Sequence, residues 1–168
     1  MEQIEVLMAT YNGERYVAQQ IDSLLKQSFQ SFRLVIRDDG STDNTREVIG
    51  AYADRYPDRI SVHPDHHNLG VIGNFSTLLE KSQARYAMLC DQDDVWLPRK
   101  IADSLQAFKQ LEAHYGADTP LLLHTDLVVV DESLAVIAPS FLTQSRLQTG
   151  HDFGRLLVKN NVTGCTAV

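Results

Sequence analysis

Cysteine is scarce in this chain of 168 residues, which contains only Cys90 and Cys165. The two lie far apart in apolar stretches, so they form neither the closely spaced pairs of a zinc site nor the framework of a disulfide-stapled domain. A domain of about 150 residues needs no staple, because it buries roughly 70% of the surface that its unfolded chain exposes. We therefore expect one globular domain whose thiols are reduced and buried, as in cytosolic proteins.

Positive charge is the minority charge in this sequence. Fifteen Lys and Arg residues stand against 22 Asp and Glu residues, which gives a formal net charge of −7. No broad positive field would draw such a protein to nucleic acid or to an anionic membrane, so neither is expected as a partner. A ligand that carries phosphate would need positive charge supplied locally.

Long apolar runs are also missing. Uninterrupted apolar runs extend over only a few residues, as at 127–130, whereas a membrane-spanning helix needs roughly 20. The N-terminus has no basic stretch leading into an apolar segment, which a signal peptide would have. Within these residues we expect no membrane span and no export signal, and we expect a cytoplasmic protein.

Short apolar segments rich in branched residues alternate with longer segments whose apolar residues recur at helical spacing. This alternation is typical of an α/β domain with a mostly parallel sheet between helices. Strands are expected over residues 4–9, 32–37, 60–63, 86–90 and 121–130, with another beginning in 164–168. Five helices are expected. The first covers 14–27, the second follows a cap at Asp43 or Asn44, the third follows the loop 64–70, the fourth begins at Pro98, and the fifth covers 153–159. A loop is expected over 139–150. The helix after the loop 64–70 carries its apolar residues at Ile72, Phe75, Leu78 and Leu79.

The first acidic cluster is Asp-Asp-Gly-Ser-Thr-Asp at 38–43, which begins where the second expected strand ends. Ligands bind at the carboxyl ends of the strands in open parallel sheets. Turn and cap chemistry accounts for much of this segment. It does not require the pair Asp38 and Asp39, and a carboxylate there can accept hydrogen bonds from a nucleobase or a ribose.

The second acidic cluster is Asp-Gln-Asp-Asp at 91–94, which follows the strand expected at 86–90. Three carboxylates within four residues repel one another unless a cation or a hydrogen-bond network compensates them. Hard oxygen ligands of this kind favour Mg²⁺ or Mn²⁺, which bridge carboxylates to substrate phosphates. An acidic protein can thus hold a diphosphate through a metal ion, although a solvated acidic turn is the alternative.

Four motifs in this order resemble the family 2 glycosyltransferases of the GT-A fold. They are Leu-Met-Ala-Thr-Tyr-Asn-Gly at 7–13, the turn at 38–43, Asn-Leu-Gly at 68–70 with Asn74, and Asp-Gln-Asp-Asp-Val-Trp at 91–96. The resemblance covers nearly the whole chain. The segment 91–96, together with Asn-Val-Thr-Gly-Cys-Thr at 161–166, is similar to the rhamnosyltransferase-like branch.

The resemblance implies a Rossmann-like GT-A domain that transfers a sugar, with inversion, from a UDP- or dTDP-linked donor to a hydroxyl acceptor in cell-surface polysaccharide synthesis, with rhamnose as the candidate sugar. Thr10, Tyr11 and Asn12 match the segment that lies against the nucleoside. Asp39 matches the carboxylate that binds the base, with Asp38 as its supporting or turn-forming neighbour.

The resemblance also implies roles for the second cluster and for the loop at 68–74. Asp91 and Asp93 match the D-x-D element, in which Asp93 would meet the metal, Mn²⁺ or Mg²⁺, and Asp91 would lie near the ribose or the metal. Asp94 and Trp96 would lie near the sugar and the acceptor. The donor pocket would be shaped by Asn68, Gly70 and Asn74, although Asn-Leu-Gly is equally an ordinary turn before a helix.

Other polar residues carry simpler interpretations. His66 and His67 have no third ligand at metal spacing and are expected to be exposed loop residues. Asp131 is expected to start a turn. Inversion needs a general base, which in this family follows the Gly-Cys-Thr segment and is expected beyond Val168; Asp126 is only a fallback. A chain without that base would bind donor and metal but transfer sugar poorly.

Two functions therefore stay open, a glycosyltransferase and a non-catalytic nucleotide-sugar-binding or scaffold module of the same fold. A phosphoacceptor domain of the receiver type would place its paired acids after the first strand, and a sugar nucleotidyltransferase would need a glycine-rich basic loop there. Neither pattern is present. The acceptor would be a saccharide or a lipid-linked saccharide, and the latter would bring the enzyme to the inner face of the plasma membrane.

Overall fold

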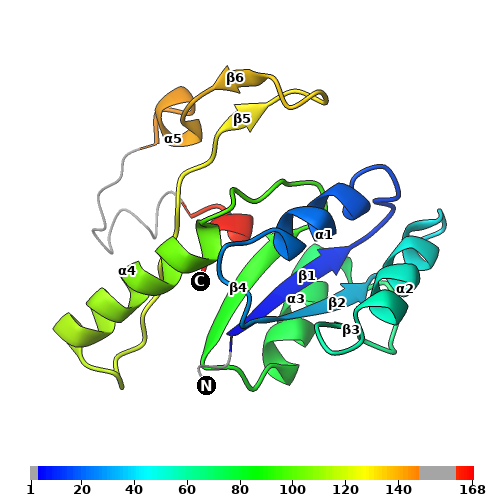
Figure 1. Cartoon of the computed structure of the whole chain (residues 1–168), viewed down its shortest axis with the longest axis horizontal. Coiled ribbons are helices and arrows are strands. Elements are labelled where there is room, and N and C mark those ends of the chain that lie inside the picture. The colour runs from blue at the N-terminus through cyan, green and yellow to red at the C-terminus, as the bar shows by residue number, and fades with distance from the viewer. Residues whose placement is uncertain (1–3, 148–161) are drawn as a thin grey trace.

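The computed structural model describes residues 4–147 and 162–168. Its centre is a parallel four-stranded sheet in the order β3-β2-β1-β4 (Figure 1). The strands are β1 (Ile4–Thr10), β2 (Arg33–Asp38), β3 (Ile60–Val62) and β4 (Tyr86–Asp91). Each lies within one residue of its predicted bounds, so the prediction of an α/β fold with a parallel sheet is confirmed.

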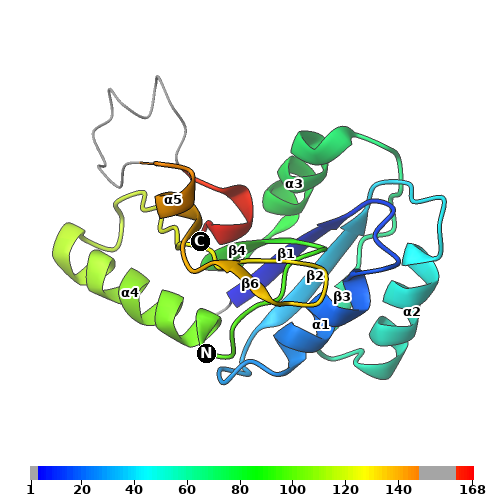
Figure 2. The same ribbon diagram turned by 90° about the horizontal axis from the view of Figure 1, so that it is seen from above.

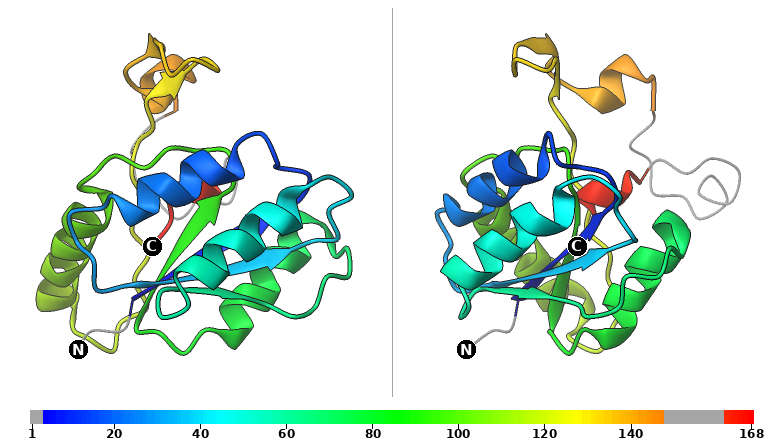
Figure 3. Two further views of the ribbon diagram at one scale, coloured as in Figure 1. Left: turned by 45° about the vertical axis from the view of Figure 1, so that its right-hand side comes forward. Right: turned by 90° about the vertical axis from the view of Figure 1, so that its right-hand side faces the viewer.

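Helices cover both faces of this sheet (Figure 2). They are α1 (Val17–Leu25), α2 (Thr45–Arg55), α3 (Gly70–Lys81) and α4 (Lys100–Tyr115). The first two share one face, α3 covers the opposite face, and α4 lies beside the β4 edge (Figure 3). At that edge the ring of Phe108 packs edge-on against Tyr86, with ring centroids 5.4 Å apart. Among the described residues, no helix combines the length and the apolar character that a membrane crossing requires.

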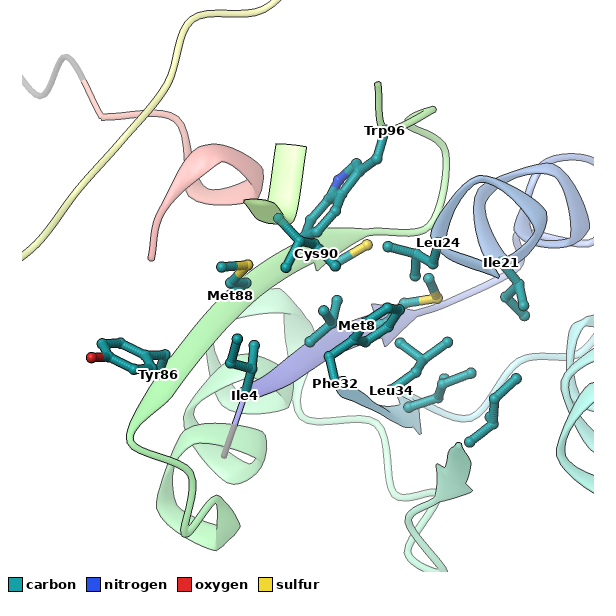
Figure 4. Close-up of a cluster of buried hydrophobic side chains, with 14 of the residues drawn as sticks. Ile4, Met8, Ile21, Leu24, Phe32, Leu34, Tyr86, Met88, Cys90 and Trp96 are labelled. Atoms are coloured by element: carbon teal, nitrogen blue, oxygen red, sulfur yellow. The ribbon is translucent and has the colours of Figure 1, made fainter. Parts of the chain in front are cut away.

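The core lies between the sheet and its helices, and Figure 4 shows its central part. Met8 and Leu34, on neighbouring strands, are almost completely buried together with Ile21 and Leu24 of α1. Parallel strands covered on both faces are apolar along most of their length, as these are. Trp96 enters the same cluster from the loop after β4, with 5% of its surface exposed.

Helix α3 differs from its predicted orientation. Ile72 and Leu79, expected on the buried face, are 81% and 47% exposed, whereas Asn74 and Leu78 are buried. The buried face includes a polar residue because the Asn74 side chain bonds to Arg37 of β2, donating to its carbonyl and accepting from its guanidinium. Apolar spacing alone therefore misplaced this helix face.

The segment from 121 onward is less regular than predicted. Instead of one strand over 121–130, a single antiparallel bridge joins His124 to Ala167, and only β5 (Val129–Val130) is extended further, paired with β6 (Val136–Ala138). The expected loop at 139–150 contains the short helix α5 (Phe141–Gln144).

The expected strand at 164–168 is instead a 3₁₀ turn, η1 (Gly164–Thr166), followed by Ala167, whose carbonyl accepts from the Leu89 N–H. Apolar composition predicted strands here, but in the described part of these two segments strand pairing is limited to the bridge between His124 and Ala167 and the short pairing of β5 with β6. The helix expected over 153–159 lies outside the described residues.

Candidate functional site

The carboxyl ends of β1, β2 and β4 meet at one edge of the sheet. The strand register pairs Thr10 with Asp38, and Ala9 with Asp91, so both acidic clusters begin beside the end of β1. The strand order changes direction at β1, and this switch point is where open α/β sheets bind ligands. A cleft of about 420 Å³ opens there, and it is lined by Ala9, Thr10, Tyr11, Asp39, Asn68, Gly70, Val71, Asn74, Phe75, Asp91, Gln92 and Asp93. The structure therefore brings eight of the predicted site residues together: Thr10, Tyr11, Asp39, Asn68, Gly70, Asn74, Asp91 and Asp93.

Asp38 lies behind the cleft wall and has a structural role. Its fully buried carboxylate accepts from the hydroxyls of Thr10 (3.0 Å) and Ser41 (2.5 Å) and from the N–H groups of Gly40 and Ser41. Gly40 has a φ of +83°, a conformation that glycine adopts without strain. This geometry favours the turn-forming role of Asp38 over direct contact with a nucleotide, because its carboxylate oxygens are occupied in closing the turn.

Asp39 reaches the cleft while it is tied to the protein on three sides. Its Oδ1 accepts from the guanidinium of Arg37 and from the Leu69 N–H, both at 2.8 Å, and its Oδ2 accepts from the Gly70 N–H at 2.9 Å. A carboxylate offers about four acceptor positions. These contacts leave one position, on Oδ2, for a ligand.

Arg37 is the buried cation that compensates Asp39. Its side chain is fully buried, and it also donates to the Asn74 side chain at 3.1 Å and to the His67 carbonyl at 2.8 Å. Asp65 lies 3.4 Å from the same guanidinium, and hydrogen bonds, first from His67 and then from Arg37, lower the pKa of that carboxyl. Nothing in the sequence singled out Arg37, because an arginine inside a strand gives no sign of which acid it will meet.

The loop after β1 is held by the loop after β2. Asn12, which has a φ of +49°, donates its N–H to the Ser41 hydroxyl, and its side chain accepts from the Thr42 N–H. Glu14 accepts from the Asn44 N–H, while its own N–H donates to Asp43. Asn12 is absent from the cleft lining, so its contacts favour a role in positioning this loop.

Gln92, which the sequence analysis also missed, connects the loops after β1 and β4. Its Oε1 accepts from the Tyr11 N–H, and its Nε2 donates to the Tyr11 carbonyl, both at 2.9 Å. The Tyr11 side chain is 48% exposed beside the cleft. The only sequence signal for this contact was the place of Gln92 between two candidate metal ligands.

The second acidic cluster divides into two parts. Asp93 is exposed at the cleft, whereas Asp91 and Asp94 are half-buried, with ligand atoms that lie, together with the Cys165 thiol, within 4.8 Å of one another. Burial first, and then the charges of Asp94 and Asp93, raises the pKa of Asp91 to about 6. Burial also raises the pKa of Asp94. The site thus collects negative charge that the described protein groups compensate only in part.

Besides Asp38 and Asn12, three predicted residues lie outside the cleft lining: Trp96, Asp94 and Asp126. Trp96, expected near the acceptor, packs in the core, where its backbone N–H donates to Ser23 Oγ and the Lys100 ammonium lies 4.8 Å from its ring centre. Asp94 lies beside Asp91 but does not line the cleft.

Asp126 accepts from the N–H groups of Leu127 and Leu142, and the hydrogen bond from the Ser140 hydroxyl is the largest contribution that lowers its pKa. The structure does not bring it to the described cleft. Asp131 closes a turn by accepting from Ser133 and Ala135, and His66 and His67 are exposed, as predicted.

Comparison with known proteins identifies the family. Residues 5–119 match the domain described as glycosyl transferase family 2. The chain belongs to glycosyl transferase family 2. This match spans β1, β2 and β4 and the greater part of the cleft lining, and it confirms the family to which the four motifs pointed.

Relatives and solved structures agree with this family. The chain is 32% identical over 129 residues to the protein EpsE of Bacillus subtilis (strain 168), covering 77% of this chain and 44% of EpsE. It is 31% identical over 155 residues to the UDP-Glc:alpha-D-GlcNAc-diphosphoundecaprenol beta-1,3-glucosyltransferase WfgD of Escherichia coli, covering 92% of this chain and 58% of WfgD. The crystal structure of S. aureus TarS 1-349 in complex with UDP has a TM-score of 0.54 and 26% identity, covering 66% of this chain and 32% of that one. The chain thus spans about half the length of the relatives it matches.

Proposed function

We propose that this chain is the nucleotide-sugar-binding part of an inverting, metal-dependent glycosyltransferase that builds a cell-surface polysaccharide. The observation that carries the proposal is the cleft at the carboxyl ends of β1, β2 and β4, with Asp39 on one side and Asp91 and Asp93 on the other. The family and the UDP complex of TarS support a nucleoside diphosphate sugar as donor. WfgD, which acts on a diphosphoundecaprenol-linked saccharide, supports a saccharide or lipid-linked saccharide as acceptor.

The nucleoside would lie on the Asp39 side of the cleft. The free acceptor position on Asp39 suits a nucleobase N–H group, and the flanking N–H groups of Leu69 and Gly70 keep this carboxylate in place. The half-exposed ring of Tyr11 offers an aromatic surface at the same wall. Both uracil and thymine present such an N–H group, so these contacts fit UDP and dTDP alike.

The diphosphate would lie on the acidic side, together with a divalent cation. Asp91 and Asp93 offer hard oxygen atoms, and burial, followed by the neighbouring charges of Asp94 and Asp93, raises the pKa of Asp91, which supports a cation beside it. These residues fit Mg²⁺ or Mn²⁺, either of which would stabilise the charge that develops on the leaving nucleoside diphosphate. Asp91 and Asp93 would hold the ion, and Asp94, which lies beside Asp91, would add negative charge next to it.

In an inverting transfer, the acceptor oxygen forms a bond to the anomeric carbon while the bond from that carbon to the diphosphate breaks on the opposite face. The acceptor proton must pass to a base. We infer that this base lies beyond Val168, since Asp126 does not line the cleft and the chain spans about half the length of its relatives. Rhamnose as the transferred sugar, and the inner face of the plasma membrane as the place of action, stay predictions.

Calorimetric titration of the chain with UDP and with dTDP tests the donor site, each in the presence of Mn²⁺, Mg²⁺ or a chelator. We expect metal-dependent binding that Asp39→Ala and Asp93→Ala both abolish. Asp103→Asn is the matched control, because this exposed acid on α4 pairs with Arg99 on the same helix. Equal binding by all variants would refute the proposed site.

A transfer assay distinguishes the two functions that the sequence leaves open. Nucleotide binding with no sugar transfer, by both this chain and a longer form that extends beyond Val168, would favour the non-catalytic module. Transfer by the longer form would establish the enzyme.

A further inference from the structure

Gln92 occupies a position between the two halves of the cleft. Its backbone belongs to the acidic loop after β4, between Asp91 and Asp93, while its side chain lies along the backbone of Tyr11 in the loop after β1. The amide donates to the Tyr11 carbonyl and accepts from the Tyr11 N–H, each at 2.9 Å. One side chain thus satisfies both backbone groups of a single residue, as a neighbouring strand would.

This pairing requires an amide side chain. The Tyr11 N–H needs an acceptor and the Tyr11 carbonyl needs a donor, and a glutamine supplies both. A glutamate of the same length would place an oxygen atom against the carbonyl. A methionine would fill the space without making either hydrogen bond.

Gly13 provides the space in which the Gln92 side chain lies. A Cβ atom at Gly13 would lie 2.2 Å from Gln92 Oε1 and 2.4 Å from its Cδ, and the three nearest heavy atoms all belong to Gln92. Gly13 is not among the residues with positive φ. The position therefore needs glycine for space, and not for its conformational freedom.

The loop that carries Tyr11 is fixed on its other side by the loop after β2. The N–H of Asn12 donates to Ser41, and the N–H of Gly13 donates to the Thr45 hydroxyl at 2.8 Å. Gln92 is therefore the link by which Tyr11 is joined to the acidic loop. A shift of Asp91 or Asp93 on binding a cation would act on Tyr11 through this side chain.

We propose that Gln92 is a positioning residue that couples cation binding at Asp91 and Asp93 to nucleoside binding at Tyr11. This inference rests on the proposed donor site and adds to it a route between its two halves. The predicted consequence is specific. Without Gln92, nucleotide and cation still bind, but the cation enhances nucleotide affinity less.

The experiment measures the factor by which Mn²⁺ tightens the binding of UDP, or of dTDP where that is the nucleotide bound, in calorimetric titrations of the whole chain. We expect Gln92→Ala and Gln92→Met to reduce this factor about tenfold, as the loss of two neutral hydrogen bonds would. Gln106→Ala is the control, because Gln106 is an exposed glutamine on α4. The melting temperature without ligands separates this effect from a loss of fold.

A double-mutant cycle tests the geometry directly. Gly13→Ala should displace the Gln92 side chain and reduce the Mn²⁺ factor as Gln92→Ala does. In the Gln92→Ala background the same change should have no further effect, because the atoms that it would meet are gone. Additive effects of the two changes would overturn the inference.

Hydrogen exchange of the Tyr11 amide, measured without nucleotide, gives an independent readout. Protection in the wild-type chain that is lost in Gln92→Ala supports the pairing, and equal exchange in both overturns it. Nucleotide binding with an unaltered Mn²⁺ factor in Gln92→Ala would overturn the coupling alone. A wild-type chain that binds neither nucleotide would refute the proposed function, and the coupling with it.

Discussion

Replacing Arg37 by methionine tests whether the buried ion pair between Arg37 and Asp39 stabilises the folded protein around the site. Methionine fills most of the space of the arginine stem but leaves Asp39, 3% exposed, with only the N–H groups of Leu69 and Gly70. Breaking a buried pair by removing one partner costs about 3–5 kcal/mol, because an uncompensated charge is left inside. The whole free energy of unfolding of a domain is about 5–15 kcal/mol, so this loss would be large.

The assay is thermal or urea unfolding of the wild-type chain and the variant. For a chain of this size the expected loss corresponds to a fall in melting temperature of about 6–20 °C. Arg99→Met is the matched control, since Arg99 pairs with Asp103 at 2.7 Å but both side chains are more than half exposed. We expect no measurable change there, because water and salt screen exposed pairs.

The double variant Arg37→Met with Asp39→Asn extends the test. Removing the second charge should restore part of the stability that the first change removes, because the buried carboxylate is then neutral. A loss below about 1 kcal/mol in Arg37→Met would refute the reasoning, since that is the level of an exposed pair.

Two further predictions concern Asp91 and helix α3. The folded pKa of Asp91 is raised from 3.8 to about 6, so ionisation of this carboxyl should destabilise the fold. Its effect on the free energy of unfolding should be absent below about pH 4, become more unfavourable as pH rises from about 4 to 6, and be complete above that window. Asp91→Asn should therefore make the melting temperature less dependent on pH over this range when no metal is present. A melting temperature whose pH dependence is the same in both proteins would contradict this. On α3, Leu78→Ala should cost about 2–5 kcal/mol in urea unfolding, whereas Ile72→Ala, at a residue that is 81% exposed, should cost little. A larger loss of stability for Ile72→Ala than for Leu78→Ala would support the helix face predicted from the sequence.

The sequence predicted the central sheet well because strand burial leaves a local pattern. β1, β2 and β4 are apolar runs that end in polar residues, and parallel strands end at a common edge. From this alone the two acidic clusters could be placed at the same edge of the sheet. The cleft that lies between them follows from the same argument.

The sequence did not predict the contacts between loops. Gln92 and Tyr11 are 81 positions apart, and Asp39 and Gly70 are 31 apart. No periodicity relates such pairs, because side chains that bond to distant backbone groups obey no local spacing. For the same reason the pattern at 121–130 suggested a long strand, although within it only His124 and the short β5 form strand pairs.

The motif residues of this family divide into those that hold the loops and those that remain available to a ligand. Asp38 and Asn12 are occupied by backbone N–H groups, and Asp39 has one acceptor position left. Strand ends leave such N–H groups without ladder partners, and each must be satisfied when it is buried. Part of a polar motif at the edge of a sheet therefore hydrogen-bonds to the backbone of the loops at that edge. What remains available at the cleft includes the aromatic ring of Tyr11, one oxygen of Asp39 and the exposed carboxylate of Asp93.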